Sequence, residues 1–223
     1  MTSVIALDGP AASGKSTLAA KLAERLNIPY INTGNMYRAI TYFALQSNID
    51  LTRDCNEAVL KNLLDNLKFE YRQGADGKYE IVLNGTAPGA KLRDPEVAKF
   101  VSPVAALPVV RNFLTAIQRE CAAKTLVVME GRDIGSVVFP DAQYKFFITA
   151  SPLERARRRL AQAGEVKAGE TLESVAAAIA ERDRIDSTRA VAPLKKADDA
   201  ILIDNTDLQL EDVLSMVIAR IKK

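Results

Sequence analysis

The spacing of apolar and polar residues along the chain predicts alternating strands and helices. Four short apolar runs have the length of buried parallel strands: residues 3–8 (SVIALD), 125–130 (TLVVME), 144–150 (YKFFITA) and 200–205 (AILIDN). Apolar residues at helical spacing lie between these runs, at 15–26, 34–46, 108–122, 152–163, 170–185 and 211–221. This alternation predicts an α/β fold in which helices cover both faces of a central parallel sheet.

One segment departs from this rhythm and predicts a small antiparallel insertion. Apolar and polar residues alternate at 69–71 and again at 79–83, with glycines and an aspartate between the two runs. Alternation on both sides of a short Gly- and Asp-containing segment is typical of a β-hairpin. We therefore expect residues 68 to about 93 to form an antiparallel insertion in the α/β core.

Composition excludes several classes of function. The chain has 223 residues, which suits one α/β core with an insertion, and its 30 basic and 28 acidic residues leave a net charge of only +2. A general nucleic-acid binder usually carries a larger basic excess, so any anion must be met by local clusters of Arg and Lys. The chain has no histidine, which excludes Ser-His-Asp triads, His-based acid–base catalysis and His-ligated metals.

The cysteines and the apolar runs favour a cytoplasmic protein. Cys55 and Cys121 are isolated in sequence, so we expect buried free thiols rather than a disulfide framework or a zinc site. The first residues lack the basic segment of a signal peptide. No apolar stretch approaches the length of a membrane span.

The clearest chemical motif is GPAASGKS at residues 9–16, which matches the pattern G-x-x-x-x-G-K-[ST]. Gly9 and Gly14 allow the backbone to bend so that successive N–H groups point into one concavity, which together with the following helix N-terminus binds phosphate. Lys15 is expected to reach the β- and γ-phosphates, and the Ser16 hydroxyl to hold Mg²⁺. The residues expected to bind ATP are Gly9, Pro10, Ala11, Ala12, Ser13, Gly14, Lys15, Ser16 and Thr17.

A phosphate-binding loop alone leaves two classes open, a kinase for a small acceptor and a nucleotide-binding switch. A GTPase should carry the guanine-reading pattern N-K-x-D, and the nearest segment, LKKADD at 194–199, lacks the Asn. A kinase needs a second anion site, and EGRD at 130–133 suits one. These charges follow a core strand, and ligands of parallel sheets bind at the carboxyl ends of strands.

Further candidates for the acceptor site are scattered along the chain. Thr33 and Arg38 flank the start of a predicted helix, and Ser102 and Arg111 share one segment. Each polar residue also has an ordinary structural explanation: an Arg on a helix is often only solvated, and an i, i+4 pair of opposite charge is common on helix surfaces. On a predicted helix face, spaced i, i+4 and i+7, lie Arg182, Asp186 and Arg189.

A cluster of arginines in the helix predicted over 152–163 has two interpretations. Arg155, Arg158 and Arg159 share one face of this helix, and Arg157 lies beside them. From the residues alone, the cluster is a solvated basic face balanced by nearby glutamates. The other interpretation, a lid that folds over the phosphates during transfer, depends on a resemblance to a known family.

Four motifs together resemble the bacterial cytidylate kinases, a family of P-loop nucleoside monophosphate kinases: DGPAASGKST (8–17), NTGNMYR (32–38), EGRDIGSVVFPDA (130–142) and RDRIDSTRAVAPL (182–194). The resemblance runs nearly end to end. It implies a three-layer P-loop fold in one kinase domain over 1–223, with the antiparallel insertion at 68–93 binding the monophosphate and a helical lid at about 154–170. The implied reaction is ATP-dependent, Mg²⁺-assisted phosphorylation of CMP, and of dCMP. From the small net charge and the short apolar runs we expect no nucleic-acid or membrane partner, and we expect a monomer. Another small-acceptor P-loop kinase, for UMP or a different monophosphate, and a non-catalytic switch are the alternatives.

The resemblance also implies roles for single residues. Glu130 stands where the family often has Asp, and Asn32-Thr33-Gly34 stands where it often has Asp-Ser-Gly. The family's cytosine-reading positions match Thr33, Arg111 and Asp133. Its ribose positions match Ser102, Arg182 and Asp186, and its acceptor-phosphate positions match Arg38, Arg132 and Arg189. The implied catalytic residues are Lys15, Arg132, Arg155 and Arg158.

Overall fold

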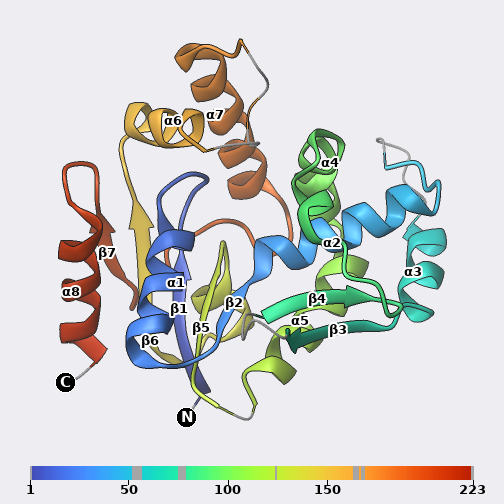
Figure 1. Ribbon diagram of the computed structural model, residues 1–223, viewed down its shortest axis with the longest axis horizontal. Coiled ribbons are helices and arrows are strands. Elements are labelled where there is room, and N and C mark those ends of the chain that lie inside the picture. Colours follow the sequence, from blue (N-terminus) through green and yellow to red (C-terminus); the bar gives the residue numbers. More distant parts are fainter. Residues whose placement is uncertain are drawn as a thin grey trace. The chain divides into compact units, whose positions relative to one another are not determined.

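The computed structural model describes residues 2–51, 57–74, 79–123, 125–162, 166 and 169–221, and the chain forms two compact units. The first unit comprises residues 1–32 and 122–223 and contains a five-stranded parallel sheet. Its strands pair in the order β2-β5-β1-β6-β7 (Figure 1). They are β1 (Thr2–Asp8), β2 (Tyr30–Asn32), β5 (Val127–Gly131), β6 (Ala142–Thr149) and β7 (Ile201–Asp204).

Helices of the first unit connect these strands. Between β5 and β6 lies a π-helical turn, η2, and the P-loop lies between β1 and α1. The helical elements are α1 (Lys15–Leu26), η2 (Ile134–Val138), α6 (Pro152–Leu160), α7 (Leu172–Thr188) and α8 (Leu210–Ile221).

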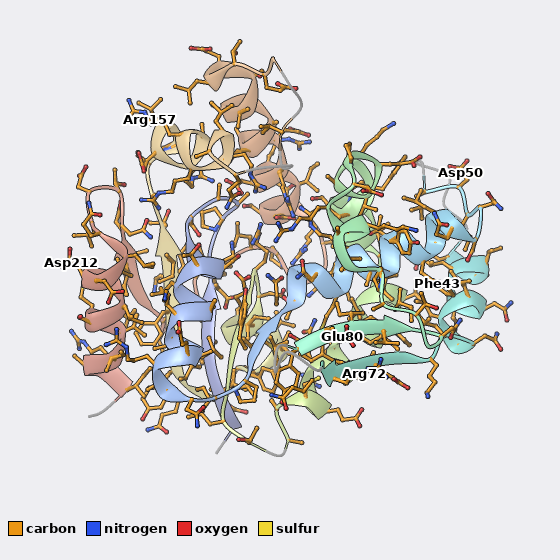
Figure 2. All side chains as sticks on the ribbon, viewed as in Figure 1. Phe43, Asp50, Arg72, Glu80, Arg157 and Asp212 are labelled. Carbon is orange, nitrogen blue, oxygen red and sulfur yellow. The ribbon has the colours of Figure 1, made fainter. Side chains whose placement is uncertain are left out.

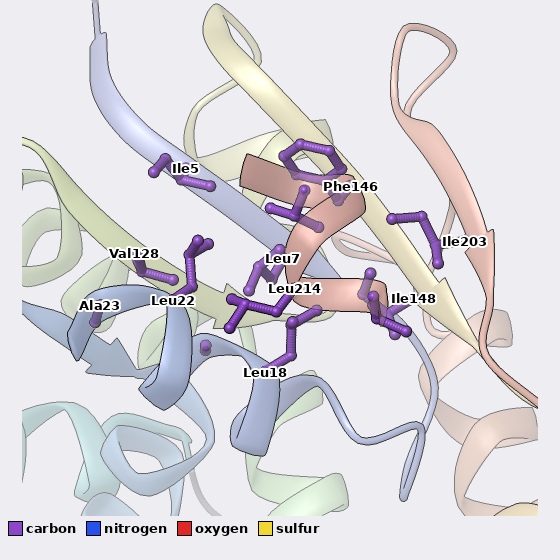
Figure 3. Packing of buried hydrophobic residues seen from close by; sticks show 13 residues of the cluster. Ile5, Leu7, Leu18, Leu22, Ala23, Val128, Phe146, Ile148, Ile203 and Leu214 are labelled. Atoms are coloured by element: carbon purple, nitrogen blue, oxygen red, sulfur yellow. The ribbon is translucent and has the colours of Figure 1, made fainter. Parts of the chain in front are cut away.

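The core of the first unit explains why its strands are continuous apolar runs. Ile5 and Leu7 of β1 belong to a buried cluster with residues of α1, β5, β6, β7 and α8 (Figure 3). Val4 and Ala6, which point to the opposite face of the sheet, are also fully buried. Because both faces of β1 are covered, polar side chains are found where this strand ends.

The second unit, residues 33–121, combines helices with a two-stranded antiparallel sheet. In this sheet Phe69 lies opposite Leu83, and Gln73 lies opposite Tyr79. Arg72 and Glu80 form an ion pair across the two strands, at 3.3 Å (Figure 2). The elements are α2 (Thr33–Gln46), α3 (Glu57–Asp65), β3 (Phe69–Gln73), β4 (Tyr79–Leu83), the 3₁₀-helix η1 (Gly89–Arg93), α4 (Pro95–Ala106) and α5 (Pro108–Cys121).

These elements confirm the predicted fold class, a central parallel sheet flanked by helices with a small antiparallel sheet added. Several details of the prediction were wrong. Beyond Leu83 the hairpin segment contains the 3₁₀-helix, α6 ends at Leu160, and α7 continues to Thr188, so that Arg189 follows the helix as its C-cap. The central residues of the predicted hairpin turn, 75–78, lie outside the described residues. Periodicity had not indicated β2, α3 or α4.

Two expectations about the whole chain can be compared with the described residues. Cys121 is a free thiol, but it is only half-buried; burial raises its pKa to about 11. Cys55 falls in a segment that the structure does not describe. Within the described part of the chain, no single helix is long and apolar enough to cross a membrane. Only the pair α4 and α5, bent by 91°, passes by length and composition, a test that buried core helices also pass.

Candidate functional site

The P-loop requires glycine at its first position because the backbone passes very close to β6. Gly9 has φ +151°, and a Cβ placed on it would lie 2.0 Å from the carbonyl oxygen of Ile148. Gly14, at φ +85°, precedes the first residue of α1 in a left-handed conformation that L-residues rarely adopt. The predicted strand–loop–helix context of the motif is therefore confirmed.

Lys15 is held inside the loop that it belongs to. Its side chain is buried and Nζ donates a hydrogen bond to the carbonyl oxygen of Pro10 at 2.9 Å. Burial lowers the pKa of Lys15 from 10.5 to about 7, and repulsion from Arg132 and Arg182 acts in the same direction, whereas Glu130 opposes it. Two further cations therefore act on the buried position of Lys15.

Glu130, on the strand next to β1, accepts hydrogen bonds at both of its carboxylate oxygens. Its Oε2 accepts from the Ser16 hydroxyl at 2.9 Å, and its Oε1 accepts from the Tyr30 hydroxyl and the Asn32 amide, both at 2.6 Å. Burial and the neighbouring carboxylate raise the pKa of Tyr30 above its ordinary value, so the phenol remains a donor at neutral pH. Two donors on Oε1 leave Oε2 oriented toward Ser16.

Two arginines of α6 bind the P-loop backbone. Arg155 donates to the carbonyl oxygen of Ala11 at 3.1 Å and pairs with Asp183. The second oxygen of Asp183 accepts the Ala11 N–H at 3.0 Å. Ala11 is therefore held on both of its backbone groups by an ion pair between α6 and α7.

Arg158 reaches the next part of the loop through Asn205. Its guanidinium donates to the side-chain oxygen of Asn205 at 2.8 Å and to the Ser13 carbonyl oxygen at 3.3 Å. The amide of Asn205 donates to the same Ser13 carbonyl oxygen at 3.0 Å. Arg157, by contrast, has a side chain that is 63% exposed and lies on the outer side of α6 (Figure 2). The arginine cluster is thus not one uniformly solvated basic face.

The charged strand tip forms an ion-pair network with the end of α7. Arg132 donates to Asp186 at 2.9 Å, and Arg189 lies 3.5 Å from Asp133 and 3.9 Å from Asp186. Both carboxylates are only 5% exposed at the side chain. Arg132, Asp133, Asp186 and Arg189 are thus brought together, and Asp186 is no ordinary surface partner of Arg182. Arg182, half-buried on α7, contributes its charge to the surroundings of Lys15.

The remaining predicted acceptor residues lie in the second unit, on three helices that pack together, α2, α4 and α5. Arg38 is buried and donates to the carbonyl oxygen of Leu92 at 3.1 Å, which rules out a merely solvated arginine. Arg111 donates to the carbonyl oxygen of Ala105 at 3.1 Å and lies 5.5 Å above the ring of Tyr37. The two hydroxyl residues, Thr33 on α2 and Ser102 on α4, are buried as well.

Several site residues were not among the sequence-based candidates. Their position in the sequence could have identified three of them. Asp8, Asn32 and Asn205 each stand at or directly after the carboxyl end of a parallel strand, where ligand sites form. Asp183 lies inside one of the four motifs, and Tyr30 carried no signal of its own.

Two buried donors beside the phosphate-binding loop suit an anionic ligand. The Ser13 hydroxyl and the Nε of Arg155 have no hydrogen-bond partner among the described residues. Buried polar atoms in native proteins nearly always have partners, and a phosphate oxygen would satisfy such donors. Within the described part of the chain, no group of three or more Cys, Asp or Glu is arranged to hold a metal ion.

Comparisons with known proteins point to one family. The model of the cytidylate kinase family matches residues 5–223. A cytidylate kinase of Carboxydothermus hydrogenoformans is 44% identical over 218 residues, covering 96% of this chain and 95% of that protein. One from Bacillus cereus is 45% identical over 215 residues, covering 96% and 94%. The crystal structure of a shikimate kinase from Bacteroides thetaiotaomicron aligns with a TM-score of 0.50 at 15% identity, over 99% of this chain and 98% of that one, a likeness of fold alone.

Proposed function

Because this chain belongs to the cytidylate kinase family, it is a nucleoside monophosphate kinase that phosphorylates CMP at the expense of ATP, and we propose how its residues carry the transfer. Residues 9–17 bind the phosphates of ATP, with Lys15 near the group that is transferred. The observation that carries this assignment is the geometry of the loop: Gly9 and Gly14 adopt positive φ between β1 and α1, and Lys15 is buried with its Nζ 2.9 Å from the carbonyl oxygen of Pro10. Lys15, Arg132 and Arg182 suit a transition state whose negative charge spreads over several phosphate oxygens.

We propose Mg²⁺ as the cofactor, with the Ser16 hydroxyl as its protein ligand and Glu130 in its outer shell. A hydroxyl and a carboxylate 2.9 Å apart supply the hard oxygen atoms that Mg²⁺ prefers, and Mg²⁺ usually completes its shell with water and phosphate oxygens. When bound, the ion neutralises part of the charge on the phosphates. Tyr30 and Asn32 keep the Glu130 carboxylate oriented toward Ser16.

The acceptor nucleotide is assigned to three groups of residues. Asp133 with Thr33 and Arg111 reads cytosine, and Ser102 with Arg182 and Asp186 contacts the ribose. Arg38, Arg132 and Arg189 bind the phosphate. The burial of Asp133, Asp186, Arg38 and Arg111 supports these roles, because buried charged side chains are rare and are held in fixed positions by their partners.

Catalysis by these residues needs no histidine. The acceptor phosphate carries about −1.5 to −2 charges at neutral pH and so attacks without a strong base. Lys15, Arg132, Arg155 and Arg158 offset the repulsion between this phosphate and the γ-phosphate of ATP. We assign residues 154–170 to a lid whose closure excludes water, and residues 68–93 to monophosphate binding within one kinase domain.

The same proposal covers substrates and location. We expect dCMP to be accepted alongside CMP, in a monomeric enzyme of the cytoplasm, where ATP and CMP are available. The half-buried free thiol of Cys121 agrees with a reducing compartment. The small net charge of +2 gives no general affinity for nucleic acid.

Base recognition provides the decisive experiment. Cytosine presents a 4-amino donor where uracil presents a carbonyl acceptor. The carboxylate of Asp133 would therefore accept a hydrogen bond from cytosine and repel the carbonyl oxygen of uracil. Such a contact is worth about 1–3 kcal/mol of discrimination. ADP release is measured by a coupled assay with CMP, dCMP, UMP and other monophosphates, for the wild type, Asp133→Asn and Arg132→Ala.

The three proteins should give different patterns. The wild type should strongly prefer CMP over UMP, and Asp133→Asn should narrow this ratio because its amide can rotate and donate to uracil. Arg132→Ala should weaken both substrates about equally, since phosphate contacts carry no base information. An unchanged CMP/UMP ratio in Asp133→Asn would show that Asp133 does not read the base.

A further inference from the structure

Asp8 is a buried acid that the mechanism above does not use. It is the last residue of β1, directly before Gly9 of the P-loop, and it is only 5% exposed. One carboxylate oxygen accepts the backbone N–H of Ile134 at 2.8 Å, and the other accepts the N–H of Gly135 at 2.7 Å. Each oxygen therefore has its own backbone donor.

These two N–H groups follow directly after Arg132 and Asp133. They open the π-helical turn η2, and the first N–H groups of a helical turn lack partners within it. The carbonyl oxygen of Asp133 accepts from Val137 at 2.9 Å and from Val138 at 3.1 Å, so the backbone of Asp133 belongs to the same turn. The Asp8 carboxylate thus attaches to β1 the turn that carries Asp133.

Gly135 leaves little room for the turn to shift. A Cβ on Gly135 would lie 3.1 Å from the side-chain carbons of Lys145 and 3.4 Å from Oδ2 of Asp8. Lys145 on β6 is itself buried and pairs with Asp199 at 2.7 Å. The turn is therefore enclosed between the carboxylate of Asp8 and the stem of Lys145.

Burial of the Asp8 carboxylate is electrostatically unfavourable. Burial, together with the nearby charge of Asp133, raises the pKa of Asp8 to about 7, although the N–H groups of Gly135 and Ile134 and the charge of Lys15 lower it. A fold that needed only stability could place an uncharged residue at this strand end. The two N–H donors, however, match a carboxylate, which alone offers an acceptor to each of them.

We propose that Asp8 is a positioning residue for phosphoryl transfer: it ties the strand end that leads into the P-loop to the turn that follows Arg132 and Asp133, and so sets the place of these acceptor-side groups relative to the P-loop. The role rests on the proposed function, because it assumes that Arg132 and Asp133 contact the acceptor nucleotide. The proposal assigns Asp8 no contact with substrate, because both of its carboxylate oxygens accept backbone N–H groups. Because it acts through Asp133, its loss should change base discrimination as well as rate.

The main test is Asp8→Asn, whose amide can accept one of the two N–H groups but presents a donor to the other. We expect kcat/KM for CMP to fall by about tenfold to a hundredfold, the range that a small misplacement near the reacting groups can cost. The CMP/UMP ratio should narrow, while KM for ATP stays within about threefold of the wild type, since the P-loop contacts remain. Asp212→Asn, the same change at an exposed acid of α8 in the same unit (Figure 2), is the control and should match the wild type.

A second variant covers the case in which Asp8→Asn does not fold. Gly135→Ala retains Asp8 but places a methyl group 3.1 Å from Lys145 and so displaces the turn by a few tenths of an ångström. We expect the same narrowing of the CMP/UMP ratio, to a smaller extent, with the melting temperature as the check on folding. An equal loss for CMP and UMP in either folded variant would overturn the positioning role and leave Asp8 purely structural. If the wild type itself does not phosphorylate CMP, the proposed function fails instead, which is a separate outcome.

Discussion

Replacing Lys15 by Met should make the protein more stable while abolishing its activity. Lys15 is buried, and its pKa falls from 10.5 to about 7 in the folded protein. At about 1.4 kcal/mol for each pH unit, this difference corresponds to a cost of about 5 kcal/mol for keeping the ammonium group charged in the fold. Met removes the charge at similar length, at the loss of one hydrogen bond to Pro10 worth about 1 kcal/mol. At pH 6 the variant should therefore be more stable by roughly 3–4 kcal/mol.

The pH dependence gives the sharper test. Between pH 7 and 10.5 the unfolded chain keeps the Lys15 proton that the folded protein has released, so the wild-type free energy of unfolding rises with pH relative to the variant. The stability gap should shrink by about 3 kcal/mol between pH 6 and pH 9. Asp8 acts in the same direction, because Lys15 lowers its pKa and removal of Lys15 raises it.

The assay is urea denaturation followed by circular dichroism at pH 6 and pH 9. Lys21→Met is the matched control, because Lys21 lies on the same helix with its side chain 49% exposed, and it should show no pH-dependent gap. Phosphoryl transfer by Lys15→Met should fall by at least about a thousandfold, since a positioned cation acts mainly on the transition state. A variant no more stable than the wild type at pH 6, or a gap that is equal at both pH values, would refute the reasoning.

Two further predictions concern the P-loop and its supports. Gly9→Ala should destabilise the protein by more than about 3 kcal/mol, because the added Cβ meets the Ile148 carbonyl oxygen at 2.0 Å, a backbone atom that cannot move aside. The control is Gly169→Ala, at φ +87° with no described atom within 4 Å of the added Cβ; its free energy of unfolding should fall by only about 1–2 kcal/mol in thermal denaturation. Equal losses of stability in the two variants would contradict the steric explanation. Replacing Arg155 and Arg158 by Met should lower kcat far more than the affinity of the free enzyme for CMP, measured by calorimetry without ATP. A matching loss of CMP affinity would instead place these arginines in the acceptor site.

The local sequence was sufficient for most of the first unit. Continuous apolar runs predicted β1, β5, β6 and β7. For β1 and β5 the reason is burial on both faces, which requires apolar residues at successive positions, whereas β7 is an edge strand on which Ile201 and Leu202 are exposed. The spacing of Gly9, Gly14 and Lys15 predicted the phosphate-binding loop, because the required backbone conformations restrict the residue types. The short strand β2 was not predicted, because three residues are too few to show a hydrophobic periodicity.

The contacts that support the site depended on the tertiary structure. The bond from Ala11 to Asp183 joins residues 172 positions apart, and the bond from Ile134 to Asp8 joins residues 126 positions apart. The second pair follows from strand order and register, in which Asp8 lies opposite Gly131 in the parallel sheet, whereas the first depends on the position of α7 beside the P-loop. Hydrophobic periodicity reports which face of an element is buried, but it does not report which distant element covers that face. The sequence by itself therefore determined the elements and the phosphate-binding loop, whereas only the packing of the sheet decided which acids hold that loop and the charged strand tip in place.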